Sequence, residues 1–233
     1  GGLSMGNNSR INGSVYSNGN IIGGNGSAIT GSAIAAGASN RIDGLTVGDS
    51  TTGEGRASQF VNTAIHGSFC PNQYCIVENP APQELPISAE MVQSWQDAAL
   101  AGGTCAMPQC DTNGDFILTN NASASLGPTK ITGKLNIDNG ATLTVTGTIW
   151  VAGEIVLSNN CNIRLSSSYA SFSGILIIDG KLTISNNCAF QGSGTSGSYI
   201  MVLSTKNSPS EEVMTIDNNS VGVIYYAGSG RVK

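Results

Sequence analysis

The second half of the chain repeats one short phrase five times, and this repeat constrains the fold more than any other feature. Each copy contains an aliphatic residue, a small polar residue, an Asn and then a residue that tolerates a tight turn. The Asn residues are separated by 19, 20, 27 and 32 positions, and they are Asn120, Asn139, Asn159, Asn186 and Asn218. A phrase that returns about every twenty residues is typical of stacked coils, in which each coil buries its apolar face against the next.

A second register supports the same stacking. The related segments 133–137, 153–157 and 180–184 each begin with Gly and a charged residue and have aliphatic residues at the third and fifth positions, and their spacings of 20 and 27 match those of the Asn residues. Short apolar runs separated by Gly, Asn and Ser indicate many short strands. Since parallel crossovers are right-handed, the sequence predicts an all-β fold, a right-handed parallel β-helix (β-solenoid) with one short inserted α-helix. We expect the repeated Asn amides to stack into a hydrogen-bonded ladder.

Composition divides this single continuous domain into three segments. Residues 1–68 contain recurring aliphatic-x-Gly triplets and are predicted to form the N-terminal coils, while residues 116–233 form the C-terminal coils. Residues 69–115 hold five of the seven prolines and interrupt the pattern. We interpret them as a disulfide-tied loop and helix insertion that packs on the solenoid.

The inserted helix has recognisable start and stop signals. Ser88 is a good N-cap, Glu90 lies in the first turn where the helix dipole favours an anion, and the Gly pair at 102–103 ends the helix. The spacing of Met91 and Trp95 predicts that both lie on the face that packs against the coils.

The six cysteines form three suggestive pairs. Four of them lie in Pro-containing segments as two pairs five positions apart, Cys70 with Cys75 and Cys105 with Cys110. Local disulfides are the simplest interpretation and favour an oxidising compartment. A four-Cys metal site is an alternative, although zinc motifs usually place their paired thiolates closer together.

Cys161 and Cys188 occupy the same place in two copies of the repeated phrase. Stacked strands would bring them about 4.8 Å apart, which is within the range that a disulfide requires. A disulfide and a reduced, buried pair both stay open at this point.

Composition excludes some classes of partner. The net charge is −5 and no basic cluster occurs, which argues against nucleic-acid binding. No stretch approaches 18 apolar residues, so the sequence contains no membrane-spanning segment. The chain begins with Gly and carries no export signal, which we interpret as the mark of a processed or truncated chain.

One segment is a candidate for metal binding. Asp111, Asn113 and Asp115 place three oxygen-bearing side chains at alternate positions, as in the first part of a calcium loop. Phe116 stands where such loops have Gly, and the distal Glu is missing. The alternatives are a calcium site and a polar turn that leads into a strand; no other cofactor is predicted.

No catalytic residue is predicted. The acids that could perform acid–base chemistry are scattered: Asp43, Asp49, Glu54, Asp138, Glu154 and Asp179. His66 is the only histidine and cannot form a His-based metal site alone. Alternating threonines at 142–148 could order water as in ice-binding solenoids, but neighbouring copies lack the matching Thr column.

Residues 80–206 resemble a family of uncharacterised bacterial surface proteins from candidate-phylum genomes. The resemblance is carried by Leu-Pro-Ile-Ser-Ala-Glu at 85–90 with Trp95, by Gly-Thr-Ile-Trp-Val at 147–151, and by the Gly/Ser-rich segment 190–199. In that family the region often follows a pilin-like N-terminal membrane helix. The resemblance therefore implies an exported domain, anchored to the envelope in the full-length protein or associated with a pilus.

These observations predict a non-enzymatic, extracellular or cell-surface scaffold or adhesin-like domain. Its expected partners are surface glycans or other envelope or pilus subunits. A carbohydrate-active β-helix enzyme of the polysaccharide lyase or hydrolase kind is the main alternative. A cytoplasmic polymerising scaffold of the bactofilin type is a third hypothesis, which disulfides would argue against.

Overall fold

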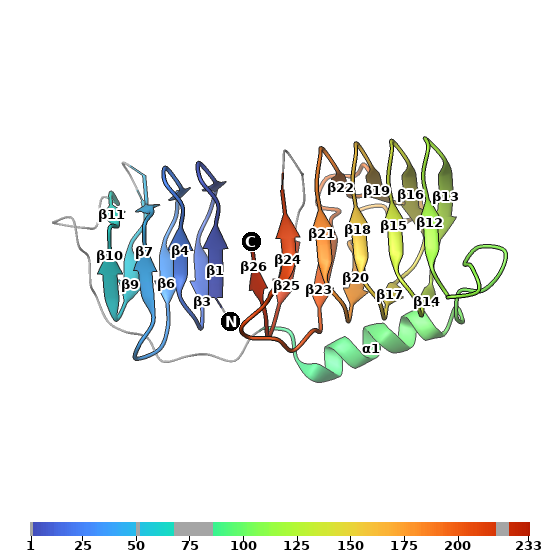
Figure 1. Ribbon diagram of the computed structural model, residues 1–233, viewed down its shortest axis with the longest axis horizontal. Coiled ribbons are helices and arrows are strands. Elements are labelled where there is room, and N and C mark those ends of the chain that lie inside the picture. Colours follow the sequence, from blue (N-terminus) through green and yellow to red (C-terminus); the bar gives the residue numbers. More distant parts are fainter. Residues whose placement is uncertain (1, 50–51, 68–85, 218–223) are drawn as a thin grey trace. The chain divides into compact units, whose positions relative to one another are not determined.

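The computed structural model describes residues 2–49, 52–67, 86–217 and 224–233 (Figure 1). The chain forms two compact units: the first comprises residues 1–84, 209–211 and 231–233, and the second comprises residues 85–208 and 212–230. The sequence predicts one continuous domain with an insertion at 69–115, whereas the contacts place the inserted helix in the second unit with the strands that follow it.

The first unit is built from short strands in three parallel sheets. The sheet orders are β10-β7-β4-β1-β26, β11-β8-β5-β2 and β3-β6-β9. The strands are β1 Gly2–Met5, β2 Arg10–Ile11, β3 Val15–Ser17, β4 Ile21–Gly23, β5 Ala28–Ile29, β6 Ala33–Ala35, β7 Arg41–Asp43, β8 Thr46–Val47, β9 Gly55–Ala57, β10 Gln59–Val61, β11 Ala64–Ile65 and β26 Arg231–Val232.

Small aliphatic side chains from all three sheets of the first unit meet in one core. Ile42 comes from the first sheet, Val47 from the second and Ala35 from the third, and all three are fully buried in the same cluster. Gly55 faces this core with no room for a side chain, because a Cβ there would lie 2.6 Å from Cδ1 of Ile65. The small residues of segment 1–68 therefore permit strands from different sheets to approach closely.

The second unit repeats this arrangement with longer strands and larger core residues. Its sheet orders are β24-β21-β18-β15-β12, β13-β16-β19-β22 and β14-β17-β20-β23-β25. Its elements are α1 Ala89–Leu100, β12 Phe116–Leu118, β13 Ser123–Leu126, β14 Thr129–Ile131, β15 Leu135–Ile137, β16 Thr142–Val145, β17 Ile149–Val151, β18 Ile155–Leu157, β19 Asn162–Leu165, the 3-10 helix η1 Ser167–Tyr169, β20 Gly174–Ile178, β21 Leu182–Ile184, β22 Ala189–Gln191, β23 Ile200–Ser204, β24 Glu212–Ile216 and β25 Ile224–Ala227.

Every strand pairing among the described residues is parallel, so the predicted β-rich, parallel fold with one inserted α-helix is confirmed. Side chains alternate between buried and more exposed positions along strands such as β15 and β17, as expected for strands with one buried face. β20 departs most from this alternation, since all five of its residues are buried.

Helix α1 explains the double-sided burial of β20. Val92 and Trp95 pack against Ile175 and Ile177, which belong to the face of β20 opposite Leu176. Figure 1 shows α1 crossing the strands of the second unit. The predicted N-cap is confirmed, because the Ser88 hydroxyl accepts a hydrogen bond from the Met91 amide at 3.3 Å.

One detail of the helix prediction is wrong. Met91 was expected on the packing face, but its side chain is 43% exposed and Val92 takes the inward position beside Trp95. Positions 92, 95 and 99 also follow helical spacing, and Ala99 is fully buried. Two overlapping apolar stripes exist on this helix, and the aromatic Trp95 is common to both.

Candidate functional site

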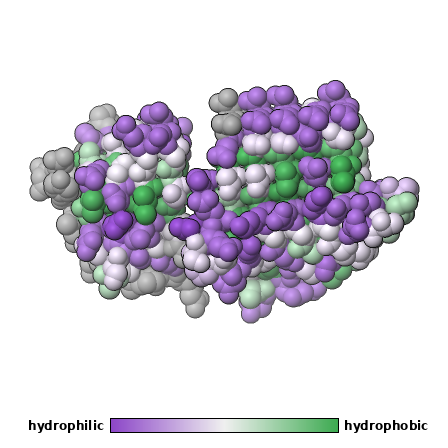
Figure 2. All heavy atoms as spheres, viewed as in Figure 1, coloured by the Kyte–Doolittle hydropathy of each residue, from purple (hydrophilic) through white to green (hydrophobic). Residues whose placement is uncertain are grey.

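The structure places the repeated Asn phrases in register on one sheet of the second unit. The aliphatic residue of each phrase pairs with that of the next, in the order Leu118, Ile137, Leu157, Ile184 and Ile216. Asn120, Asn139, Asn159 and Asn186 follow two positions later and share a left-handed conformation, with φ between 51° and 58°. Asn218 lies outside the described residues. In Figure 2 the turns that follow β12, β15, β18 and β21 form a hydrophilic rim above a hydrophobic band.

The amide ladder is present over part of this column. Nδ2 of Asn186 donates to Oδ1 of Asn159 at 3.1 Å, and Nδ2 of Asn187 donates to Oδ1 of Asn160 at 3.2 Å. Asn159 in turn donates to a carboxylate oxygen of Asp138 at 2.8 Å. Nδ2 of Asn139 donates to Oγ1 of Thr119 at 3.5 Å, and backbone bonds such as that from the Asn121 amide to the Asn139 carbonyl at 2.8 Å also join neighbouring turns.

Asp138 is an ionised member of this column. Burial alone would raise the pKa of the Asp138 carboxyl, but hydrogen bonds from Ser158, Asn159 and the Asn139 amide outweigh it and lower the pKa. Asp138 therefore acts as a hydrogen-bond acceptor that joins two adjacent turns.

The calcium candidate forms a loop closed by its own side chains. Oδ1 of Asp111 accepts hydrogen bonds from the amides of Asn113 at 2.8 Å and Asp115 at 2.9 Å. Oδ1 of Asp115 accepts from the Lys134 amide at 2.8 Å, and its Oδ2 lies 3.7 Å from Nζ of Lys134. These contacts describe a polar turn that leads into β12, and calcium binding stays a prediction. Within the described ranges, no group of three or more His, Cys, Asp or Glu gathers as metal ligands do.

Two disulfides are present among the described cysteines. Cys105 and Cys110 form the predicted local bond, with Cα atoms 5.7 Å apart. Cys161 and Cys188 are also bonded, with Cα atoms 4.5 Å apart, so the alternative of a reduced pair is wrong. This second bond joins the residues that directly precede the paired strands β19 and β22. Cys70 and Cys75 lie outside the described residues.

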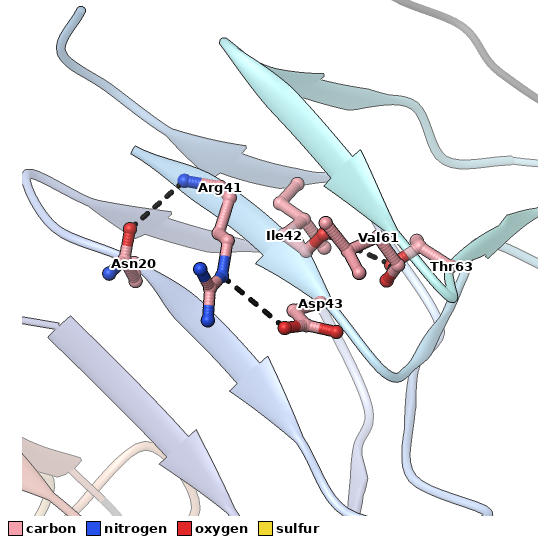
Figure 3. Close-up of polar contacts among 6 residues, drawn as sticks. All are labelled: Asn20, Arg41, Ile42, Asp43, Val61 and Thr63. Atoms are coloured by element: carbon pink, nitrogen blue, oxygen red, sulfur yellow. Dashed lines mark hydrogen bonds and ion pairs between the residues drawn. The ribbon is translucent and has the colours of Figure 1, made fainter. Parts of the chain in front are cut away.

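In the first unit, polar side chains link neighbouring strands (Figure 3). Oδ1 of Asn20 accepts a hydrogen bond from the Arg41 amide at 3.0 Å, and Nε of Arg41 lies 3.3 Å from Oδ2 of Asp43. Thr63 donates to the carbonyl of Ile42 at 3.1 Å. The bonds made by Asn20 and Thr63 join neighbouring strands, whereas the Arg41–Asp43 pair lies within β7. His66 is exposed, and its backbone amide donates to the carbonyl of Val47.

The remaining acids have separate partners rather than forming a catalytic pair. In the first unit Glu54 lies 2.8 Å from Arg56. In the second unit Asp179 accepts hydrogen bonds from Nε1 of Trp150 at 2.8 Å and from Thr205 at 2.6 Å. Trp150 also lies beneath the ammonium of Lys130, which is 3.6 Å from the ring centroid. The aromatic ring is thus held from two sides by opposite charges.

The second unit also contains an open cleft of about 630 Å³ on the β13-β16-β19-β22 sheet. Its floor is a row of three side chains on adjacent strands: Thr144 of β16 pairs in register with Arg164 of β19, which pairs with Gln191 of β22. Since the buried neighbours Val145 and Leu165 face the core, the row faces outward.

The walls of the cleft are the segment 165–167 and the loop 192–198. The loop is held by its own hydroxyl groups. Ser198 donates to the carbonyl of Phe172 at 2.8 Å and accepts from the Ser193 amide at 3.0 Å, while the Ser193 hydroxyl donates to the carbonyl of Ala170. Gly192 allows the loop to close, because a Cβ there would lie 2.0 Å from the carbonyl oxygen of Ser198.

Sequence reasoning missed this cleft, although the repeat contained a signal for it. Thr144, Arg164 and Gln191 each lie five positions after an Asn of the repeated phrase, namely Asn139, Asn159 and Asn186. Extending each copy of the repeated phrase by five positions would have placed the three floor residues at equivalent positions. The wall loop could not be aligned, because it belongs to the longer step between two copies.

No protein-family model, curated protein or solved structure matches this chain. The resemblance to bacterial surface proteins therefore stays a prediction. Among the described residues, no helix has both the length and the apolar composition needed to cross a bilayer.

Proposed function

We propose that this chain is an exported, non-enzymatic surface scaffold or adhesin-like domain whose units are right-handed parallel β-helices. The observation that carries the proposal is the Cys161–Cys188 disulfide, which joins two in-register coils inside the second unit. Disulfides persist in oxidising compartments and are rare in the cytosol, so a bonded core favours export.

The in-register parallel strands support a structural role. Each coil of the second unit pairs with its neighbours through three sheets, and the pairs continue across Leu118, Ile137, Leu157, Ile184 and Ile216. Because stacked repeats bury a continuous core, a scaffold of this kind gives length and rigidity from few residue types. The partners that we propose are surface glycans or other subunits of the envelope or of a pilus, at the cell surface.

Thiol trapping in the native host tests the proposal. Intact cells that produce the full-length protein are treated with N-ethylmaleimide, and the peptides that contain Cys161 and Cys188 are then analysed by mass spectrometry without reduction. We expect a disulfide-linked peptide pair, together with loss of the domain when protease is added outside the cells. Alkylated thiols in a protease-protected protein would contradict export and would favour the bactofilin-type hypothesis.

A further inference from the structure

The polar cleft of the second unit is built for a ligand that carries both hydroxyl groups and a negative charge. We infer that it binds an acidic polysaccharide and that Arg164 engages a sugar carboxylate. This inference deepens the proposed adhesin-like role by naming the class of ligand, and it rests on that role for access to glycans outside the cell.

The first step concerns the exposure and the contacts of the Arg164 side chain. Its side chain is exposed, and its one described contact is a long hydrogen bond of 3.4 Å from Nε to the Thr144 hydroxyl. Arg56, on a strand of the first unit, instead has an acid at 2.8 Å. Arg164 lines the cleft, and its described hydrogen bond uses Nε, so the two terminal nitrogens of its guanidinium are available to bind a carboxylate through two parallel hydrogen bonds.

The second step is the charge of the cleft. Of the described residues that line it, Arg164 is the one charged side chain, and the others are neutral. The chain as a whole has a net charge of −5, so a positive cleft is a local exception. An anionic ligand would be attracted to this cleft.

The third step is the polar lining, which suits a sugar. The cleft is lined by the hydroxyl groups of Thr144, Ser166, Ser167, Ser193, Thr195, Ser196 and Ser198 and by the amide of Gln191. Hydroxyl and amide groups both donate and accept hydrogen bonds, as sugar hydroxyls do. The one aliphatic side chain in the lining, Leu165, is only 2% exposed, so the residues that line the rest of the cleft are polar or glycine.

The fourth step is preorganisation. The bonds that Ser193 and Ser198 make to the carbonyls of Ala170 and Phe172 hold the wall loop in place, and the floor is a hydrogen-bonded sheet. A ligand would therefore bind without first ordering the cleft, which reduces the entropic penalty of binding. The open shape allows an internal stretch of a long polymer to enter from the side.

Isothermal titration calorimetry with matched probes tests the inference on the full 233-residue chain. The probes are tetramers of galacturonate, of alginate and of hyaluronan, and the control ligand is the fully methyl-esterified galacturonate tetramer, in which a neutral methyl ester replaces each carboxylate. We expect at least one acidic tetramer to bind, and we expect tenfold higher salt to weaken that binding. We also expect the ester to bind about three- to tenfold more weakly than galacturonate if galacturonate is the ligand.

Two variants locate the site. Arg164→Gln should weaken binding of the acidic tetramer by about three- to tenfold, whereas the matched control Arg10→Gln, on an exposed strand position of the first unit, should leave it unchanged. Gln191→Ala should weaken the acidic and neutral forms alike. Circular dichroism melts verify that each variant folds, which we expect because both Arg164 and Gln191 are exposed.

Three results would overturn the inference: no binding of any acidic tetramer at millimolar concentration, equal binding of Arg164→Gln, or tighter binding of poly-glutamate than of every tetramer. The first two leave the proposed export and scaffold role intact, since that role is tested by thiol trapping. Conversely, a cytoplasmic location would remove the proposed role even if the cleft bound acidic sugars in vitro.

Discussion

At the scale of single residues, the repeated Asn side chains combine two properties at one position. Asn159 adopts a left-handed backbone with φ of 56°, and its amide bonds to Asp138 in the preceding turn and to Asn186 in the next. Gly also tolerates this backbone but has no amide, and most other residues are strained there. The repeat therefore marks a turn conformation as well as a ladder of hydrogen bonds.

Substitution of Asn159 separates these two contributions. Asn159→Gly should lower the free energy of unfolding by about 1 kcal/mol, because it removes the amide bonds but keeps the turn. Asn159→Ala should lower it by about 2 to 3 kcal/mol, because the left-handed backbone adds a further penalty. Urea denaturation followed by circular dichroism measures both. Equal losses for the two variants would contradict a role for the backbone conformation.

Tyr225 is a second residue with a clear physical signature. Its hydroxyl is buried and makes no hydrogen bond within the described part of the chain, while its ring meets Phe190 edge-on with centroids 6.2 Å apart. Burial raises the pKa of the Tyr225 hydroxyl well above its ordinary value. The neutral form is therefore favoured in the folded protein.

This shift predicts a loss of stability at alkaline pH. Above the ordinary tyrosine pKa of about 10, the unfolded chain releases the Tyr225 proton and the folded chain retains it, so stability falls as pH rises. Tyr225→Phe should leave the free energy of unfolding at pH 7 unchanged or raise it by about 1 kcal/mol. Above pH 10, the variant should lose stability less steeply with rising pH than the unsubstituted protein. Burial also raises the pKa values of Tyr169 and Tyr226, so part of the slope should remain. Thermal melts between pH 9 and 11 measure this dependence. If the melting temperature of Tyr225→Phe falls with pH as steeply as that of the unsubstituted protein, Tyr225 does not cause the alkaline loss of stability.

At the scale of elements, helix α1 protects the outer face of β20. Trp95→Ala should lower the free energy of unfolding of the second unit by about 2 kcal/mol, because it removes a half-buried indole that packs on Ile175 and Ile177. Met91→Ala is the matched control on the same helix and should change stability by less than about 0.5 kcal/mol, since Met91 is largely exposed. Equal effects would show that the packing face includes Met91 after all.

The same helix shows how far a sequence can predict an element. Ser88 and the Gly pair at 102–103 give local signals, and the helix, Ala89–Leu100, lies between them. Its inward face depends on the neighbouring sheet, which the helix sequence does not contain. The continuous apolar run of β20 indicated that something covers its outer face, and that run, rather than Met91, was the more informative signal.

Among site residues, the repeat predicted those that lie on strands and at turns, because residues at the same position in each copy pair in register on neighbouring strands although the steps between copies differ. Arg164 was overlooked because a lone exposed Arg has no local pattern, and it gains meaning only beside Thr144 and Gln191. The bond between Cys161 and Cys188 depended on side-chain direction, which spacing alone left open.

At the scale of the whole molecule, the Cys161–Cys188 disulfide covalently joins two segments of the second unit that are distant in sequence. Replacing both cysteines with Ala should lower the free energy of unfolding by roughly 3 to 4 kcal/mol, since the bond closes a segment of 27 residues in the unfolded chain. Replacing both Cys105 and Cys110 with Ala should lower the free energy of unfolding by a smaller amount, because that bond closes a separation of only 5 residues. Chemical denaturation of the three proteins provides the comparison, and a larger loss for the short loop would contradict this reasoning.

The unequal steps between copies have a consequence for how such a chain can change. The strands of the second unit stay aligned although the excursions between them vary from one turn to the next, as the cleft wall at 192–198 illustrates. Insertions at these crossovers leave the ladder undisturbed, so new surfaces can be added one loop at a time. Exchanging the wall loop for loops of other lengths would thus give proteins of equal stability with different recognition, a modular route for both natural variation and engineering.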